Sequence, residues 1–105
     1  MIDPATWDVA ALAAAWRGGE PFAHAAVDGV VSEAALARLR DGIAHEPHWP
    51  NRGELFEMMA SGEPTVPALR ELISALGSAE VRAAVGAISG RALVRADGNS
   101  YVYLA

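Results

Sequence analysis

The stretch Asn-Ser-Tyr-Val-Tyr-Leu-Ala, residues 99–105, predicts a β-strand at the carboxyl end of the sequence. Tyrosine and valine favour a pleated, half-buried surface, and a strand rich in them presents backbone donors and acceptors that need partners. The sequence before it contains few segments that favour strands. We therefore expect residues 99–105 to be the opening of a larger sheet.

Length and composition indicate one globular domain. The chain has 105 residues, of which 52% are hydrophobic and 20% charged, values typical of a domain with one core. It has no cysteine, which excludes disulfides and thiolate metal sites. All its basic residues are arginines, they are scattered among acids, and the net charge is -5, which disfavours nucleic acid as a partner.

The amino-terminal residues do not have the pattern of a signal peptide. Asp3 stands where such a peptide carries basic residues, and the apolar run from Val9 to Trp16 is about half as long as a membrane span. We expect a soluble, cytoplasmic protein with no membrane partner.

Apolar residues recur at helical spacing in four segments, each of which begins at a residue that favours a helix start. The starts are Asp3-Pro4, Ser32, Pro67 and Ser78; the apolar stripes are Val9/Leu12/Trp16, Leu36/Leu39/Ile43, Leu69/Leu72/Ile73/Leu76 and Val81/Val85/Ile88. Glycines at 18–19, 77 and 90 are expected to end the first, third and fourth helix.

The remaining segments predict strands and loops. Apolar and polar residues alternate weakly from Phe22 to Val27, which suits a short strand. The prolines within His45 to Gly53 exclude a regular helix there and indicate a surface loop. Glu54 to Ala60 suits a short helix or a buried irregular plug. Leu93-Val94-Arg95 and Ser100 to Leu104 flank Asp97-Gly98, which favours a hairpin. The expected fold class is α+β, with residues 1–92 mainly helical and 93–105 forming the hairpin.

No complete catalytic constellation is visible in the sequence. His45-Glu46-Pro47-His48 lacks the spacing that places two zinc-binding imidazoles on one helix face, so a solvated loop is favoured over a metal site. His24 lies in an apolar stretch that favours a structural role. There is no nucleophile elbow and no phosphate-binding glycine loop. We assign no catalytic residue and no metal ligand.

The order of segments resembles a known enzyme family. Residues 21–32, Pro-Phe-Ala-His-Ala-Ala-Val-Asp-Gly-Val-Val-Ser, resemble the opening of prolyl-4-hydroxylase-like Fe(II)/2-oxoglutarate-dependent oxygenases. Leu69 to Ser78 and Ile88-Ser89-Gly90 are similar to the paired support helices of that family. The resemblance covers residues 20–105. It implies a helical support layer with a short amino-terminal strand and a carboxyl-terminal hairpin that enters a double-stranded β-helix, or jelly roll, here incomplete.

The resemblance also implies which residues could take part in the site. The family's iron triad begins with His-x-Asp, and no histidine of this chain is followed by aspartate two positions later. Tyr103 stands where several relatives place a tyrosine that reaches the 2-oxoglutarate pocket, and Tyr101 shares its strand face. Trp49 to Arg52 would border a substrate channel. The alternative interpretation of Tyr101 and Tyr103 is that they are ordinary aromatic residues of a sheet. The alternative interpretation of Trp49 to Arg52 is a surface loop.

Two function hypotheses follow. In the first, the chain is the amino-terminal portion of a dioxygenase that hydroxylates an amino acid, peptide or small molecule. Fe(II) and 2-oxoglutarate then belong to the complete enzyme, and the chain alone is inactive. The rest of that domain would come from the same gene or from a separate chain that pairs with Ser100 to Leu104. In the second, the chain is a non-catalytic interaction module that associates through its terminal strand edge, with itself or a partner. An unrelated small α+β domain is a third possibility.

Overall fold

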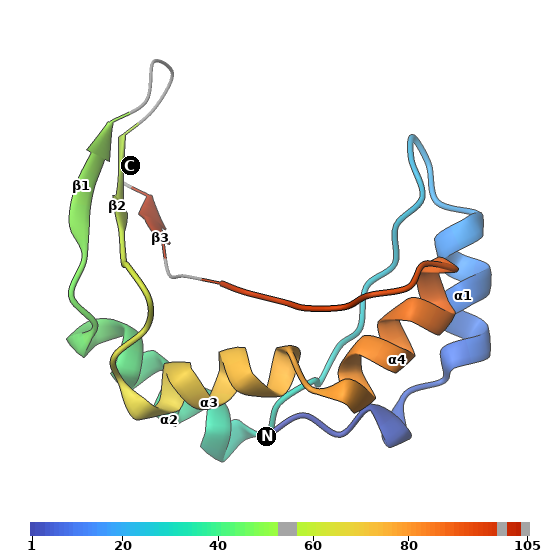
Figure 1. Ribbon diagram of the computed structural model, residues 1–105, viewed down its shortest axis with the longest axis horizontal. Coiled ribbons are helices and arrows are strands. Elements are labelled where there is room, and N and C mark those ends of the chain that lie inside the picture. Colours follow the sequence, from blue (N-terminus) through green and yellow to red (C-terminus); the bar gives the residue numbers. More distant parts are fainter. Residues whose placement is uncertain (53–56, 99–100, 104–105) are drawn as a thin grey trace.

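The computed structural model describes residues 1–52, 57–98 and 101–103, with side chains described except at positions 51, 52, 57 and 101–103. Within these residues the chain is an α+β protein with four α-helices and a small antiparallel sheet (Figure 1). The elements are η1 (Pro4–Thr6), α1 (Val9–Arg17), α2 (Glu33–His45), β1 (Trp49–Arg52), β2 (Glu57–Ala60), α3 (Pro67–Leu76), α4 (Ala79–Ser89) and β3 (Tyr101–Tyr103).

The predicted caps of α2 and α4 are confirmed. The hydroxyl of Ser32 accepts a hydrogen bond from the backbone N–H of Ala35 at 3.1 Å, and that of Ser78 accepts one from Val81 at 3.3 Å. These bonds satisfy N–H groups that have no partner within the helix. Gly90 ends α4 with φ +73°, a left-handed conformation that glycine adopts without a steric penalty.

The first helix begins later than the sequence predicts. The carboxylate of Asp3 accepts a hydrogen bond from Ala5 and so caps only the 3-10 turn η1. Trp7 then adopts an extended conformation with ψ 139°, which interrupts the helical path. Asp8 caps α1 instead, because its carboxylate accepts a hydrogen bond from Ala11 at 3.0 Å.

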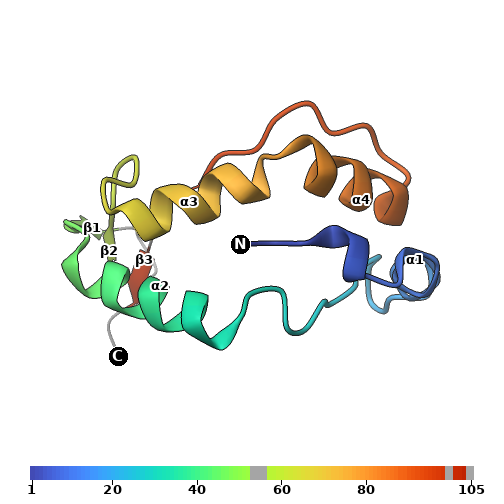
Figure 2. The ribbon, with the colours of Figure 1, turned by 90° about the horizontal axis from the view of Figure 1, so that it is seen from below.

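The helices pack in two pairs, α1 against α4 and α2 against α3 (Figure 2). Leu39 of α2 meets Ala68 and Leu69 of α3 in a small core that Met1, Val31, Val66 and Leu72 surround. The buried face of α2 is formed by Ala35, Leu39 and Gly42, so the predicted stripe is only partly correct: Ile43 is exposed. Small residues there let the two helices approach closely, since a Cβ on Gly42 would meet Val66 at 3.1 Å.

The sheet has the order β1-β2-β3, and both pairs are antiparallel. In the register, Trp49 faces Ala60, which faces Tyr101, and Met58 pairs with Tyr103. The prediction of a surface loop from His45 to Gly53 is therefore wrong, because α2 continues to His45 and β1 follows from Trp49. Among the described residues β1 pairs with a strand on one side only, and such an edge strand is where a sheet tolerates a proline like Pro50.

Two further predictions about the sheet are wrong. Within the predicted helix Glu54 to Ala60, the residues Glu57–Ala60 form the strand β2 instead, while residues 54–56 lie outside the described part. The predicted hairpin of Leu93-Val94-Arg95 with Ser100 to Leu104 is replaced by pairing of β3 with β2. The sheet therefore begins within residues 1–92, which were expected to be mainly helical. β2 pairs with its sequence neighbour β1 on one side and with the distant β3 on the other, and the pairing with β3 is not visible in any local pattern.

Phe22 to Val27 was predicted as a short strand and has no regular structure. The Nδ1 atom of His24 lies 2.8 Å from the carbonyl oxygen of Phe22, and the two rings meet edge to face. These contacts close a compact turn in which Gly19 fits tightly, since a Cβ there would lie 2.6 Å from the same carbonyl oxygen. The predicted turn at Asp28-Gly29 is consistent with the positive φ of 65° at Gly29.

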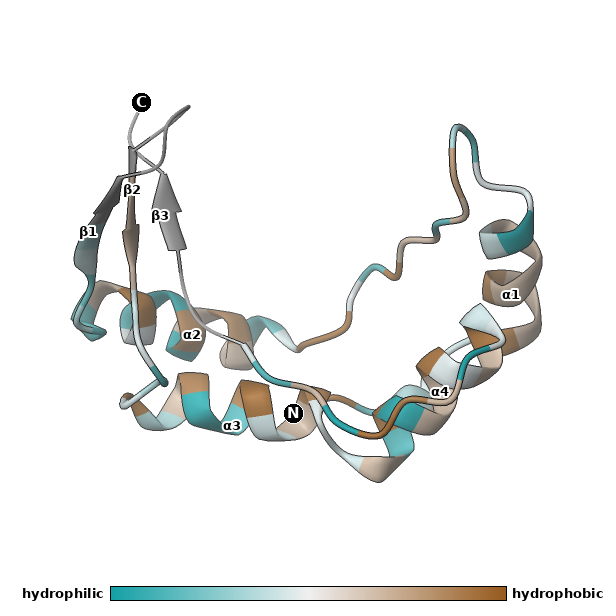
Figure 3. Cartoon of the chain, turned by 45° about the horizontal axis from the view of Figure 1, so that its top comes forward, coloured by the Kyte–Doolittle hydropathy of each residue, from teal (hydrophilic) through white to brown (hydrophobic). Residues whose placement is uncertain are grey.

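The molecule is an open arch. Its radius of gyration is 15.7 Å, whereas a compact domain of this length has about 13 Å. Its accessible surface is 7450 Å², against about 5,600 Å² for a compact protein of this mass. The sheet stands at one end of the arch and the loop after α1 at the other (Figure 1). Residues 91–98, the return segment, run between these ends with hydrophobic residues in their middle part (Figure 3).

Among the described residues no single helix is long and apolar enough to cross a membrane. Taken together, α3 and α4 reach that length and composition, but they are bent by 48° at the break between them.

Candidate functional site

Three of the four site residues predicted from the sequence fall on one face of the sheet. Trp49 and Tyr101 both align with Ala60, and Tyr103 aligns with Met58. Residues two apart on a strand share a face, and directly opposed residues of neighbouring strands do so as well. Positions 49, 101 and 103 therefore belong to one surface. The side chains of Tyr101 and Tyr103 lie outside the description, so their predicted contact with a cofactor stays a prediction.

Arg52 falls on the opposite face of the sheet from Trp49. The two residues are three positions apart on β1, and strand side positions alternate with a period of two. The register pairs Arg52 with Glu57 at the end of the ladder. Trp49 and Arg52 therefore do not share a face of this sheet, and the expectation that they border a substrate channel stays a prediction.

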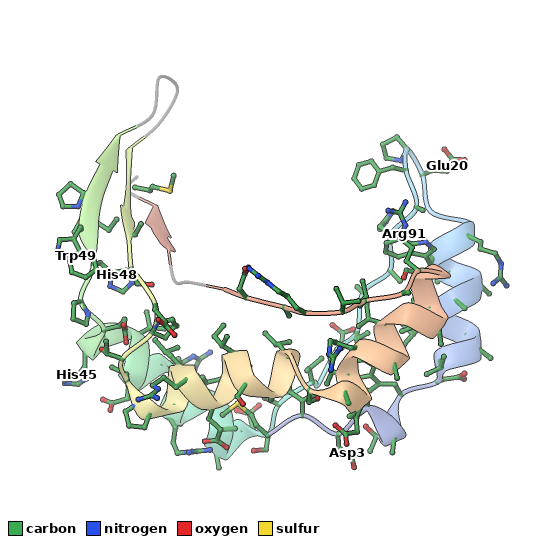
Figure 4. The ribbon with its side chains drawn as sticks, viewed as in Figure 1. Asp3, Glu20, His45, His48, Trp49 and Arg91 are labelled. Atoms are coloured by element: carbon green, nitrogen blue, oxygen red, sulfur yellow. The ribbon has the colours of Figure 1, made fainter. Side chains whose placement is uncertain are left out.

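Trp49 is the exposed aromatic at the base of the sheet (Figure 4). It is 58% exposed, and its ring lies beside Gly62, where a Cβ would be 3.7 Å from the ring. Gly62 also lines an open cleft of about 560 Å³ between the loop after β2, Ile73 of α3 and the end of the return segment. The cleft carries the carboxyl groups of Glu63 and Asp97, and Asp97 is paired with Arg95 at 3.0 Å.

Each of the three histidines has a backbone carbonyl near its Nδ1 atom. His24 contacts Phe22, His45 contacts Asp41, and His48 contacts Glu46, at 2.7–2.8 Å. Such local contacts orient the imidazole ring, which agrees with a structural role for His24. Figure 4 shows that His45 lies at the end of α2 and His48 next to Trp49.

The most constrained charged group near these residues is Glu46, which follows α2 directly. Its side chain is buried with 5% exposure. Its carboxylate accepts hydrogen bonds from the backbone N–H of Thr65 and of Val66, both at 2.9 Å, and from the Thr65 hydroxyl at 3.3 Å. It thus joins the end of α2 to the start of α3.

These contacts lower the pKa of Glu46 below its usual value of 4.5. The hydrogen bond from the Val66 backbone N–H has the largest effect; burial acts in the opposite direction, and the Thr65 backbone, the Thr65 hydroxyl and His48 lower the pKa further. Hydrogen bonds to the ionised form stabilise it relative to the protonated acid. Glu46 is therefore a buried carboxylate that stays charged because α3 presents unpaired N–H groups to it.

Sequence reasoning missed the role of Glu46. The available signal was at α3, where Val66 occupies the N-cap position and has no side chain that can accept a hydrogen bond. A helix start without a local cap needs an acceptor from another segment. The sequence shows that this need exists, but only the packing of α2 on α3 identifies Glu46 as the residue that meets it.

Within residues 1–52, 57–98 and 101–103, no three His, Cys, Asp or Glu side chains are grouped so that they could hold a metal ion. No protein-family model matches this sequence, and comparison with curated proteins and with solved structures finds no match. The functional argument therefore rests on the residues and on the geometry described above.

Proposed function

We propose that this chain is the helical support layer of an Fe(II)/2-oxoglutarate-dependent oxygenase and that it becomes active only with the double-stranded β-helix of that enzyme. The observation that carries the proposal is the open arch. Among the described residues no large side chain is less than 2% exposed, and the accessible surface exceeds that of a compact protein by about a third. A second layer packed on the arch would complete the core.

The element order supports the same proposal. A thirteen-residue helix follows Ser32, two adjoining helices begin at Pro67 and Ala79, and β3 comes after them. These are the elements that the resemblance to prolyl-4-hydroxylase-like oxygenases implies. The chain departs from that pattern at residues 22–27, which form no strand, and in the pairing of β3 with β2.

The described residues do not fit an iron site, because they provide no group of three metal-binding side chains. Iron ligands would have to come from the β-helix. The contribution of this chain would be to the rim of the site. A phenol at position 103 can donate a hydrogen bond to a carboxylate, such as that of 2-oxoglutarate, and position 101 shares its face. Trp49 would contact the substrate. A cytoplasmic location is part of the proposal.

The test compares the 105-residue chain with the product of its reading frame extended beyond Ala105. The chain alone should neither bind Fe(II) in calorimetry nor convert 2-oxoglutarate to succinate. A longer product containing His-x-Asp should do both, and in it Tyr103→Phe should raise the KM for 2-oxoglutarate more than Tyr101→Phe does. Metal-dependent turnover by the pure 105-residue chain would overturn the proposal, as would a longer product without His-x-Asp.

A second candidate function is that of an interaction module, favoured by the position of β3. This strand pairs with β2 on one side, and among the described residues its other edge has no strand beside it. An unpaired edge can accept a strand from another chain. Val102→Pro would then abolish a stable oligomer seen by light scattering. A monomeric wild-type chain would exclude self-association through this edge.

A further inference from the structure

The open cleft at the base of the sheet continues along α3. It lies where the loop after β2, α3 and the end of the return segment meet (Figure 1). Its larger part, of about 560 Å³, and a smaller part, of about 200 Å³, share the lining residues Glu63, Pro64 and Ile73. Arg70 and Ser74 line the smaller part in addition. Because three residues line both parts, they form one elongated cleft, which we call the α3 cleft.

One face of α3 forms a wall of this cleft. Arg70, Ile73 and Ser74 are three and four positions apart, so they lie on the same side of the helix. The side that packs on α2 carries Ala68 and Leu69 instead. The packing of the two helices therefore leaves the side of α3 with the charged residue facing the cleft.

The smaller part of the α3 cleft holds two opposite charges that are not paired. Among the described residues, the side chains of Glu63 and Arg70 make no ion pair or hydrogen bond with each other or with any other group. The carboxylate of Asp97, in the larger part, is already paired with Arg95 at 3.0 Å. One carboxylate and one guanidinium thus remain available, and both lie at the same end of the cleft.

A ligand that carries one charge of each sign close together would satisfy both groups. The head group of an α-amino acid is of this kind, since its ammonium and carboxylate are attached to one carbon atom. The guanidinium of Arg70 can donate two parallel hydrogen bonds to a carboxylate, and the carboxylate of Glu63 can accept from an ammonium. A simple anion or a simple cation would leave one of the two residues without a partner.

The larger part of the cleft suits an apolar side chain. Its lining includes Ile73, Ala96 and the buried Pro64, and the charge of its Asp97 is balanced by Arg95. At one boundary the return segment closes onto α3, because a Cβ on Gly98 would lie 2.8 Å from Ile73. An aliphatic group placed there would be removed from water, which favours binding. The volume lies within the range of about 300 to 1,000 Å³ that is typical of small-molecule sites.

We propose that the α3 cleft binds a free α-amino acid with an apolar side chain. Glu63 and Arg70 hold the head group, and the side chain lies over Ile73 in the larger part. The inference goes beyond the proposed function, because binding here needs neither iron nor 2-oxoglutarate and belongs to this chain alone. A failure to bind would leave the oxygenase proposal standing, and an inactive longer product would leave the amino acid site standing.

A titration with three related ligands tests the head-group contacts. The probe is L-leucine; isocaproate is the same molecule without the ammonium, and isoamylamine is the same molecule without the carboxylate. L-leucine should shift the amide signals of Gly62, Ile73 and Gly98 in the isotope-labelled chain. Each truncated ligand should bind about tenfold more weakly, because it loses a hydrogen bond to a charged group. Absence of shifts with L-leucine, or equal binding of L-leucine and either truncated ligand, overturns the proposal.

Variants of the two charged residues assign each contact. Arg70→Gln should remove the advantage of L-leucine over isoamylamine and keep its advantage over isocaproate, and Glu63→Gln should do the reverse. Both side chains are exposed and have no partner among the described residues, so neither change should lower the melting temperature. Arg40→Gln and Glu20→Gln, at exposed positions that do not line the cleft, are the matched controls. Weakening of the same size in the controls, or the same ligand preference in both cleft variants, contradicts the assignment.

Discussion

The carboxylate of Glu46 accepts a hydrogen bond from the backbone N–H of Val66 at 2.9 Å, across twenty positions of sequence. Val66 precedes the first residue of α3, and Glu46 directly follows the last residue of α2. The contact therefore gives α3 the cap that its own sequence lacks and fixes the start of one helix beside the end of the other. The small core around Leu39 and Leu69 lies between the same two helices.

The acid sensitivity of the fold should depend on Glu46. Its pKa is lowered by folding, so its stabilising effect is present above its usual value of 4.5 and is lost as the pH falls through the folded-state value. Glu46→Gln should lower the urea midpoint at pH 6, and the gap to the wild type should narrow towards pH 3.5. Glu20→Gln, on an exposed loop, should match the wild type at both pH values. A gap that is constant with pH would show that the charge of Glu46 is not what stabilises the contact.

Arg82 should control the order of the return segment. Its guanidinium donates to the carbonyl oxygens of Gly77 and Val94 at 3.0 and 2.9 Å, and a lysine cannot donate to both in that fixed geometry. Arg82→Lys should cost about 1 to 2 kcal/mol of stability and speed amide exchange near Val94. Arg40→Lys, at an exposed position of α2, is the matched control. Unchanged exchange near Val94 in the Arg82 variant would contradict this role.

Gly86 should be required for the close approach of the return segment to α4. A Cβ there would lie 2.7 Å from the carbonyl oxygen of Arg91, a backbone atom that cannot turn away. Gly86→Ala should therefore displace the segment, despite the better helix propensity of alanine, with a cost of about 1 to 3 kcal/mol. Thermal melts and amide exchange of residues 91–93 measure this. Gly18→Ala, whose Cβ would meet nothing closer than 3.5 Å, should be tolerated, and equal effects would refute the steric explanation.

Leu69 should be the most sensitive core position of α3. It is 6% exposed and packs on Leu39, so Leu69→Ala leaves a cavity between α2 and α3. The expected loss is about 2 to 4 kcal/mol of unfolding free energy, measured with urea. Leu76→Ala in the same helix removes the same atoms from a side chain that is 41% exposed, and should cost under about 1 kcal/mol. A similar loss in both variants would show that α2 and α3 do not form the core.

The candidate site illustrates how far sequence patterns reach. Trp49, Tyr101 and Tyr103 were each singled out by type and position, but their placement on one sheet face depends on the register through β2. That register joins segments about forty to fifty residues apart. The residues of β2 itself suggested a helix, because a short apolar run has no periodicity that separates helix from strand. Pro50 counted against a strand at β1 because proline has no N–H to donate to a ladder. That reason excludes proline from the central strands of a sheet but not from an edge strand.

What the sequence by itself determined is the set of helices. Ser32, Ser78 and Gly90 act on backbone groups within a few residues, so their effects are local and can be predicted. Only the tertiary structure decided the sheet, the cap from Glu46 to α3 and the course of the return segment. The pairing of β3 with β2 and the cap from Glu46 to Val66 join residues twenty to about forty-five positions apart, and these contacts form only when the packing of the helices has brought them together.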